Sequence, residues 1–451
     1  MNQNPFQWQC QPEAENLVLS ILNKALVLNP FIQTLSADLE KHTSTRLFDF
    51  LDHVAVTYSA EIEKELELAG YVLEHTTQNY RNFIHPGAKL PRIVIKDSDP
   101  LPALIEIGVA VESIADFLNV RGLSCHIEGS SCSPYRRAIV STENDVSLLA
   151  LERRGSCLME PSFLDPIQQE QYRLAEEKWM TRPRAMQDED EAMHQTLRIA
   201  QEIIEMVGEN TAAWIVLSVE RKYWQARNMA GQLQKNRQDR LGMGWANHDH
   251  HTFRSSRKRF SQLVRLFEML GFHCRERYYT GKEAGWGAQI MENSHCNLVL
   301  FLDVDLTSEE VEIDFAHHPL PEIKTLGTIG LWTALHGDSI LKAGMHHLEA
   351  QFLFEELTTD LNHLGVGMMQ PFSSFPFLKQ AFTAGEIWHV DPKKINRLYE
   401  KGLITAESRD KFISYGAIGS HLENLQRREG YKGFNQKNVS VIIKKTDPRT
   451  S

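Results

Sequence analysis

Short runs of alternating apolar and polar residues, each followed by a stretch with helical spacing, organise residues 47–155. Residues 50–56 predict a strand. Residues 59–69 predict a helix, with Ile62, Leu66 and Ala69 on one face and Gly70 ending it. Three further strands are predicted, at 71–74, 80–84 and 91–95.

The same order of elements then occurs a second time. Residues 105–111 predict a strand and 114–120 a helix that ends at Gly122. The later strands of this second unit are predicted at 124–127, 136–141 and 146–151. A repeat with a period of about fifty residues is the strongest fold signal in the chain.

Helical patterns flank this pair of units. Residues 1–46 predict short helices that form a cap, with a break at Asn29-Pro30. Residues 156–240 predict a charged helical connector, which includes helices at 168–179, 189–206 and 211–219. Its basic stretch 222–240 is typical of a solvated helix face.

The pattern of strand, helix and three strands returns in residues 241–451. The predicted elements are a strand at 247–254, a helix at 260–270, strands at 274–279, 286–291 and 297–302, a helical insertion at 308–341, a strand at 345–352 and a helix at 354–364. The chain is therefore predicted to be α+β, with domains at 47–155 and 241–451 joined by the connector.

Charge and cysteine content narrow the functional classes. The chain has 451 residues and a net charge of -11, which gives no electrostatic footprint for nucleic acid. No apolar run is long enough for a membrane span, and the first ten residues do not resemble a signal peptide. The six cysteines form no CxxC pair. We therefore expect a cytoplasmic protein with free thiols and no membrane or nucleic-acid partner.

The predicted strand at 247–254 carries the richest chemistry in the chain. Side chains alternate along a strand, so His248, His250, Thr252 and Arg254 share one face. Imidazole nitrogens are metal ligands, and a guanidinium binds carboxylates. The alternative is a polar strand in which the histidines cluster by chance.

The four unit openings resemble those of the vicinal oxygen chelate superfamily. They read Leu-Asp-His-Val-Ala-Val at 51–56, Glu-Ile-Gly-Val-Ala-Val at 106–111, Asp-His-His-Thr-Phe-Arg at 249–254 and His-His-Leu-Glu at 346–349. The resemblance implies that each pair of units curls into a half-open β cup around a divalent metal. It places candidate ligands in the N-terminal pair at His53, Glu106 and Glu152. That pair is either a second metal site or a structural copy without metal.

The C-terminal half is similar, more specifically, to the iron-dependent 2-oxoadipate dioxygenase/decarboxylase family. His250 and Arg254 have the spacing of that family's metal-binding histidine and carboxylate-binding arginine. In that family the second histidine stands in an Asn-His-Leu-like context, which His-His-Leu at 346–348 resembles, so the second ligand is placed at His347. The family's glutamate stands in a Gly-Glu-Ile context, which residues 385–387 match, so the third ligand is placed at Glu386.

Three alternatives stay open within this assignment. His346 instead of His347 can be the ligand, since neighbours in a strand face opposite ways. Glu423, in Gly-Ser-His-Leu-Glu at 419–423, can replace Glu386. Arg254 can pair with a surface carboxylate rather than bind substrate.

The resemblance implies a function for such a site. Two histidines and one carboxylate leave three positions on Fe(II) for a bidentate 2-oxo acid and O2. The expected reaction is oxidative decarboxylation of a small-molecule carboxylate to a 2-hydroxy acid. The alternatives are another metal-dependent enzyme of the same fold, such as a lyase, isomerase or ring-cleaving dioxygenase, and a non-catalytic protein that binds a small molecule.

Overall fold

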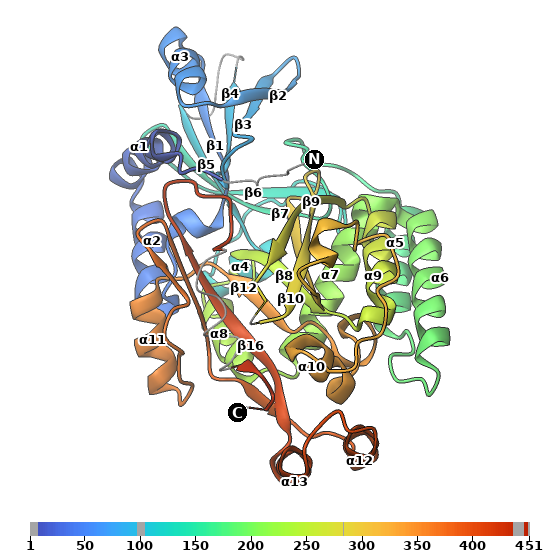
Figure 1. Ribbon diagram of the computed structural model, residues 1–451. Coiled ribbons are helices and arrows are strands. Elements are labelled where there is room, and N and C mark those ends of the chain that lie inside the picture. Colours follow the sequence, from blue (N-terminus) through green and yellow to red (C-terminus); the bar gives the residue numbers. More distant parts are fainter. Residues whose placement is uncertain (1–7, 97–103, 283, 436–445, 450–451) are drawn as a thin grey trace.

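Two open mixed β-sheets, with helices packed around them, make up the computed structural model of the chain (Figure 1). It describes residues 8–96, 104–282, 284–435 and 446–449. The strands of each sheet come from consecutive parts of the chain. The predicted α+β class with paired strand–helix–strand units is confirmed. The exact domain limits stay a prediction.

The first sheet contains seven strands in the order β2-β3-β4-β1-β5-β7-β6. Each unit's opening strand runs parallel to the last strand of its unit, as β1 does to β4 and β5 to β7. The two opening strands pair antiparallel at the centre. The strands are β1 (Leu51–Thr57), β2 (Val72–Thr76), β3 (Tyr80–Ile84), β4 (Arg92–Lys96), β5 (Ile105–Ala110), β6 (Tyr135–Glu143) and β7 (Val146–Arg153).

The second sheet repeats this plan in the order β13-β14-β16-β12-β8-β11-β10-β9, with β15 added on β16. Opening strands β8 and β12 pair antiparallel, and each is parallel to its closing strand, β11 or β16. The strands are β8 (His248–Arg254), β9 (His273–Tyr279), β10 (Trp286–Asn293), β11 (Leu298–Asp305), β12 (His347–Ala350), β13 (Ser373–Phe375), β14 (Leu378–Phe382), β15 (Glu386–Trp388) and β16 (Ala417–Arg427).

Helices cover both sheets. Their bounds are α1 (Pro12–Leu28), α2 (Pro30–Thr43), α3 (Ala60–Leu68), α4 (Ile114–Val120), α5 (Pro166–Met180), α6 (Glu189–Val207), α7 (Glu209–Gln225), α8 (Met229–Asp239), α9 (Phe260–Met269), α10 (Thr328–His336), α11 (Phe354–His363), α12 (Pro392–Glu400) and α13 (Ala406–Tyr415). Helices α1 to α4 share a buried apolar cluster with the first sheet. The N-terminal helices α1 and α2 therefore pack on the first sheet.

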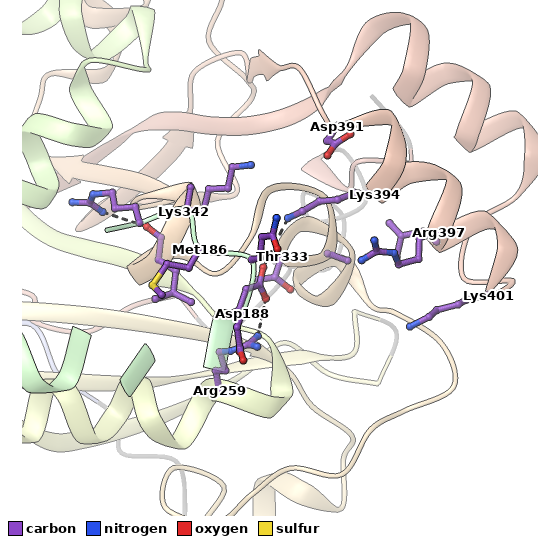
Figure 2. Close-up of a pocket in the computed structure, with 16 residues that line it drawn as sticks. Met186, Asp188, Arg259, Thr333, Lys342, Asp391, Lys394, Arg397 and Lys401 are labelled. Atoms are coloured by element: carbon purple, nitrogen blue, oxygen red, sulfur yellow. Dashed lines mark hydrogen bonds and ion pairs between the residues drawn. The ribbon is translucent and has the colours of Figure 1, made fainter. Parts of the chain in front are cut away.

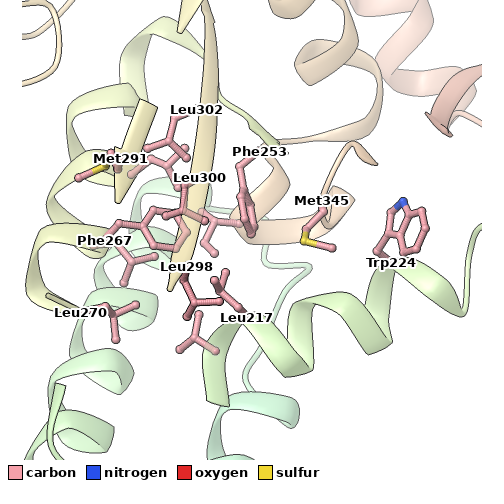
Figure 3. Packing of buried hydrophobic residues seen from close by; sticks show 14 of the residues in the cluster. Leu217, Trp224, Phe253, Phe267, Leu270, Met291, Leu298, Leu300, Leu302 and Met345 are labelled. Carbon is pink, nitrogen blue, oxygen red and sulfur yellow. The ribbon is translucent and has the colours of Figure 1, made fainter. Parts of the chain in front are cut away.

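The main apolar core lies between the second sheet and helices α5, α6, α7 and α9. Figure 3 shows Phe253 and Phe267 packed with Leu298, Leu300 and Leu302 of β11. Alternate side chains of β8 thus enter this core, while the intervening ones face the opposite side of the sheet. The core fixes the strand that carries the histidines.

Local signals explain where several helices begin. The side chains of Ser59 and Ser113 accept hydrogen bonds from the backbone of the first turns of α3 and α4. Asn29 ends α1 and caps α2, and Pro30 occupies the first position of α2. Across the described residues no single helix is long and apolar enough to cross a membrane, although the bent pair α1 and α2 meets that length and composition together.

Two predicted elements are wrong. Residues 124–127 do not form a strand, because the loop before β6 turns sharply at Gly129 and Cys132, both with positive φ. The first sheet therefore has one strand fewer than predicted. The insertion at 308–341 is helical mainly at α10 and in the following turn, Ser339–Ala343. Before residue 328 its described part is largely irregular.

The substitution Glu220→Gln is expected to lower the free energy of unfolding by about 3–5 kcal/mol at pH 7. The fully buried Glu220 carboxylate accepts hydrogen bonds from Trp179, Arg182 and Arg184, and its loss leaves buried guanidinium groups without a counter-charge. Burial raises the pKa of Glu220, but the arginines outweigh it and hold that pKa below its usual value. The carboxylate's contribution is thus complete at neutral pH and is lost as pH falls below about 4.

Guanidinium chloride unfolding at pH 7 measures this effect, and the difference between variant and wild type should shrink when the measurement is repeated at about pH 3. The control is Glu202→Gln, which removes an exposed pair with Lys178 and should change stability by less than about 0.5 kcal/mol. Equal stability of Glu220→Gln and wild type at pH 7 would contradict the prediction.

Candidate metal centre

Three neighbouring strands bring histidine and glutamate side chains together on one face of the second sheet. In the ladder, His250 of β8 lies opposite Glu349 of β12, which in turn lies opposite Glu423 of β16. His347 precedes Glu349 by two residues, so it shares that face. The pairing of opening strands with a closing strand therefore builds this cluster.

The four side chains are within contact distance. Glu349 Oε1 lies 3.1 Å from His250 Nε2 and 2.6 Å from His347 Nε2, and His347 Nε2 lies 3.4 Å from Glu423 Oε2. His250, Glu349 and Glu423 each offer a ligand atom, and these three atoms lie within 4.8 Å of one another. All four residues are buried. We call His250, His347, Glu349 and Glu423 the His/Glu cluster.

A second layer of polar contacts fixes His250. Its Nδ1 lies 3.0 Å from Asp249 Oδ1, and Arg427 donates to both oxygens of Asp249, at 2.9 and 3.1 Å. Although burial raises the pKa of Asp249, Arg427 keeps it well below the usual value. An ionised Asp249 accepts a hydrogen bond from the Nδ1–H of His250, so the Nε2 lone pair faces the cluster.

The charges of the His/Glu cluster fit a bound cation. Burial and the neighbouring Glu349 raise the pKa of Glu423 well above its usual value. Burial alone would raise the pKa of Glu349 too, but the two histidines lower it to about 2. Glu349 Oε2 is buried without a hydrogen-bond partner among the described residues. Two crowded carboxylates and two imidazoles form a donor set that a divalent metal satisfies.

Arg254 lines the same cavity as the cluster, and part of its guanidinium makes no hydrogen bond within the described residues. It is 5% exposed, its Nε is 3.6 Å from Asp303 Oδ2, and its guanidinium lies over Trp332. Nε and Nη1 have no hydrogen-bond partner among the described residues. Burial lowers the pKa of Arg254 to about 10 and raises that of Asp303 to about 7. Arg254 therefore does not pair with a surface carboxylate, and a ligand carboxylate can complete its hydrogen bonding.

The cluster and Arg254 line one small cavity of about 60 Å³. Aromatic side chains enclose it, namely those of Tyr278, Trp286, Phe301, Phe372, Phe382 and Phe434. A larger hollow of about 920 Å³ beside α12 is different: Lys342, Lys394, Arg397 and Lys401 reach it, and its described lining contains no histidine or cysteine (Figure 2). The small cavity is therefore where metal and substrate chemistry can meet.

The structure brings together only part of the predicted ligand set. His250 and His347 are in the cluster, but Glu386 is not. The Oε2 of Glu386 accepts a hydrogen bond from the backbone of Met229, and the residue pairs with Ser420, three residues before Glu423 on β16. Three residues correspond to roughly 10 Å along a strand. The alternative Glu423 occupies the cluster.

The alternative ligand His346 also lies outside the cavity lining. Its Nδ1 is 3.1 Å from the carbonyl oxygen of Gly419, and its ring packs edge-on against Trp332. A histidine held in this way is satisfied by the fold.

The three candidates of the N-terminal sheet do not come together in one cluster. His53 Nε2 lies 3.6 Å from Glu106, and Lys96 binds the same carboxylate at 2.7 Å. Glu152 instead pairs with Arg154 and accepts a hydrogen bond from Ile114 at the start of α4. Lys96 thus provides the positive charge that a metal would provide, so we infer that this pair of units is a structural copy.

Glu349 and Asp303 belong to the site but were not among the residues predicted from the sequence. Glu349 stands two residues after His347, and period-two alternation along a strand was enough to place both on one face. Asp303 had no local signal. It reaches Arg254 because β11 lies beside β8 in register, with Asp303 opposite Arg254.

Comparisons with known proteins give only weak likenesses. No protein-family model and no curated protein matches the chain. A triple mutant of 4-hydroxymandelate synthase from Streptomyces coelicolor is 11% identical, with 88% of this chain and 98% of that chain covered and a TM-score of 0.30.

Two shorter structures match smaller parts of the chain. Methylmalonyl-CoA epimerase from Mycobacterium tuberculosis is 10% identical, with 40% and 87% covered and a TM-score of 0.23. A glyoxalase/bleomycin resistance protein/dioxygenase superfamily member from Vibrio splendidus is 9% identical, with 22% and 95% covered and a TM-score of 0.17. The function proposed for this chain therefore rests on its own residues.

Proposed function

We propose that this chain is an Fe(II)-dependent dioxygenase of the vicinal oxygen chelate superfamily. Its substrate would be a 2-oxo acid with a second carboxylate, such as 2-oxoadipate. With O2, the products would be CO2 and the 2-hydroxy acid one carbon shorter. The observation that supports this most is the buried His/Glu cluster, which shares a cavity with Arg254, two of whose nitrogens make no hydrogen bond within the described part of the chain.

His250, His347 and Glu423 would hold the metal. Two histidines and a carboxylate with open positions are the donor set typical of ferrous oxygenases. When bound, iron supplies the oxygen chemistry of the oxidative decarboxylation. Asp249 fixes the ring and tautomer of His250. The aromatic walls exclude bulk water, which strengthens each charged contact inside the cavity.

Arg254 would bind the substrate's distal carboxylate. Nε and Nη1 make no hydrogen bond within the described residues, and the ion pair of Nε with Asp303 is long, at 3.6 Å, so both nitrogens can donate to a substrate carboxylate. The pKa of about 7 for Asp303 means that a neutral Asp303 can coexist with a substrate anion at physiological pH. Arg254 and Asp303 thus set substrate orientation rather than the oxygen chemistry.

Glu349 supports a second candidate function. If it joins the other three as a fourth donor, fewer positions stay open for a bidentate substrate and O2 together. A fuller, carboxylate-rich set suits metals such as Mn²⁺ and reactions that need no oxygen. The second candidate is therefore a metal-dependent lyase or isomerase built on the same cluster.

Metal content of anaerobically purified protein, followed by oxygen uptake after addition of 2-oxoadipate, tests the proposal. We expect about one iron per chain, and one CO2 released for each O2 consumed. Turnover with Mn²⁺, Ni²⁺ or Zn²⁺ in the absence of oxygen would favour the second candidate. Failure to bind any of these metals after reconstitution would overturn both and favour a non-catalytic binding protein.

A further inference from the structure

A second cavity, of about 480 Å³, is separate from the metal centre. Residues of the first sheet, of α7 and of the C-terminal half line it, and none of them lines the small cavity with the His/Glu cluster. Its volume is in the range of small-molecule sites. The charges of its lining show what it can bind.

Every carboxylate that lines this cavity already has a basic partner. The pairs are Asp49–Arg46, Asp52–Arg153, Glu74–Arg92, Glu112–Lys235, Glu152–Arg154, Glu176–Lys222 and Glu292–Lys432. The lining also contains seven lysines and arginines, and five of them belong to these pairs. Arg221 and Lys89 have no carboxylate within 4.0 Å among the described residues. Two basic side chains of the cavity therefore have no carboxylate at ion-pair distance within the described residues, although Asp249 and Glu292 act on Lys89 from farther away.

Arg221 is the stronger indication of a ligand. Its side chain is buried, with the residue 4% exposed, and its Nε has no hydrogen-bond partner in the described part of the chain. Its other nitrogens make only long contacts of 3.3 Å with His251 and Ser218. Burial lowers the pKa of Arg221, and the more distant Glu112 opposes this. A buried charge without a partner is costly to the fold, so a ligand anion would relieve that cost.

The walls of the cavity define the rest of the ligand. Trp214 lies against the Arg221 guanidinium at 5.4 Å and near the His248 ring at 6.3 Å. Trp245 and Tyr172 also line the cavity. A planar guanidinium beside an indole ring suits a carboxylate carried on an aromatic or apolar body.

We propose that this second cavity binds a small organic carboxylate with an aromatic or apolar body, held by Arg221 and Lys89. The site does not depend on the proposed reaction at the metal centre. It would give the protein a separate ligand site.

Isothermal titration calorimetry of the full chain with phenylacetate, and with its uncharged analogue phenylacetamide, tests the site. We expect one phenylacetate per chain with millimolar or tighter affinity, and binding of phenylacetamide at least tenfold weaker. Arg221→Gln and Lys89→Gln should each weaken phenylacetate binding at least tenfold. Phenylacetate should also raise the Tm of the wild type but not that of Arg221→Gln.

Two controls locate the binding. Lys222→Gln removes a cavity-lining charge that is already paired with Glu176, and it should leave the affinity unchanged. Arg254→Gln should also bind phenylacetate normally. Loss of binding in Arg254→Gln, equal binding of phenylacetamide, or unchanged affinity in Arg221→Gln and Lys89→Gln would each overturn the proposal. Absence of saturable binding in the millimolar range would do so too. Because Arg221 is a buried charge, Arg221→Gln should have the Tm of the wild type or a higher one. If Arg221→Gln does not fold, Lys89→Gln tests the proposal by itself.

Discussion

Alanine in place of His250 is expected to leave the purified chain almost free of metal and to lower turnover of 2-oxoadipate at least roughly 1,000-fold. The ring lies at the centre of the second sheet, opposite Glu349, and Asp249 holds its other nitrogen. Its loss removes a neutral donor and leaves Glu349 and Glu423 crowded in a buried site. Metal analysis of the purified variant and an oxygen-electrode assay measure the two effects.

The matched control is His346→Gln. It changes a neighbouring buried histidine that contacts the Gly419 carbonyl, and glutamine keeps a donor for that contact. We expect metal content near the wild-type value. Loss of metal in His346→Gln with full retention in His250→Ala would reverse the assignment of the cluster.

Much of the fold was predictable because hydrophobic periodicity is a local property. The opening strand and the helix of each unit, and most of the later strands of the first three units, were predicted within a few residues of their observed bounds. No strand was predicted after residue 364, where β13 to β16 lie. The failures came where no strong periodicity existed, as in the insertion at 308–341, or where a turn replaced a strand, as at 124–127.

The candidate site was harder because strand pairing creates it. The motif around Glu386 is as local and as plausible as that around Glu423, and only the parallel pairing of β16 with β12 shows which carboxylate faces the histidines. A short motif does not encode this register. Asp303 acts through Arg254, and Arg427 acts through Asp249. Each of these pairs joins residues far apart in the chain, so no local pattern predicts the contact.

The substitution Arg254→Gln is expected to remove the enzyme's preference for a substrate with a distal carboxylate. In the wild type, 2-oxoadipate should be favoured over 2-oxohexanoate, which lacks that group, because only the first can accept hydrogen bonds from Nε and Nη1 of Arg254, which make none within the described residues. Loss of a buried charge-paired hydrogen bond costs about 2 kcal/mol or more, so KM for 2-oxoadipate should rise roughly 30-fold or more. The KM for 2-oxohexanoate should change little, and metal content should not change.

The pattern across both substrates separates substrate binding from a structural defect. A misfolded or metal-depleted variant loses kcat for both acids, whereas loss of the carboxylate contact affects only one. Arg254→Lys keeps the charge but cannot donate a bidentate pair of hydrogen bonds, so it should recover only part of the preference for 2-oxoadipate. Arg277→Gln, on a more exposed part of β9, is the control with unchanged kinetics. Equal increases of KM for the two acids in Arg254→Gln would show that Arg254 does not contact the distal carboxylate, and the search for that contact would move to other residues of the cavity.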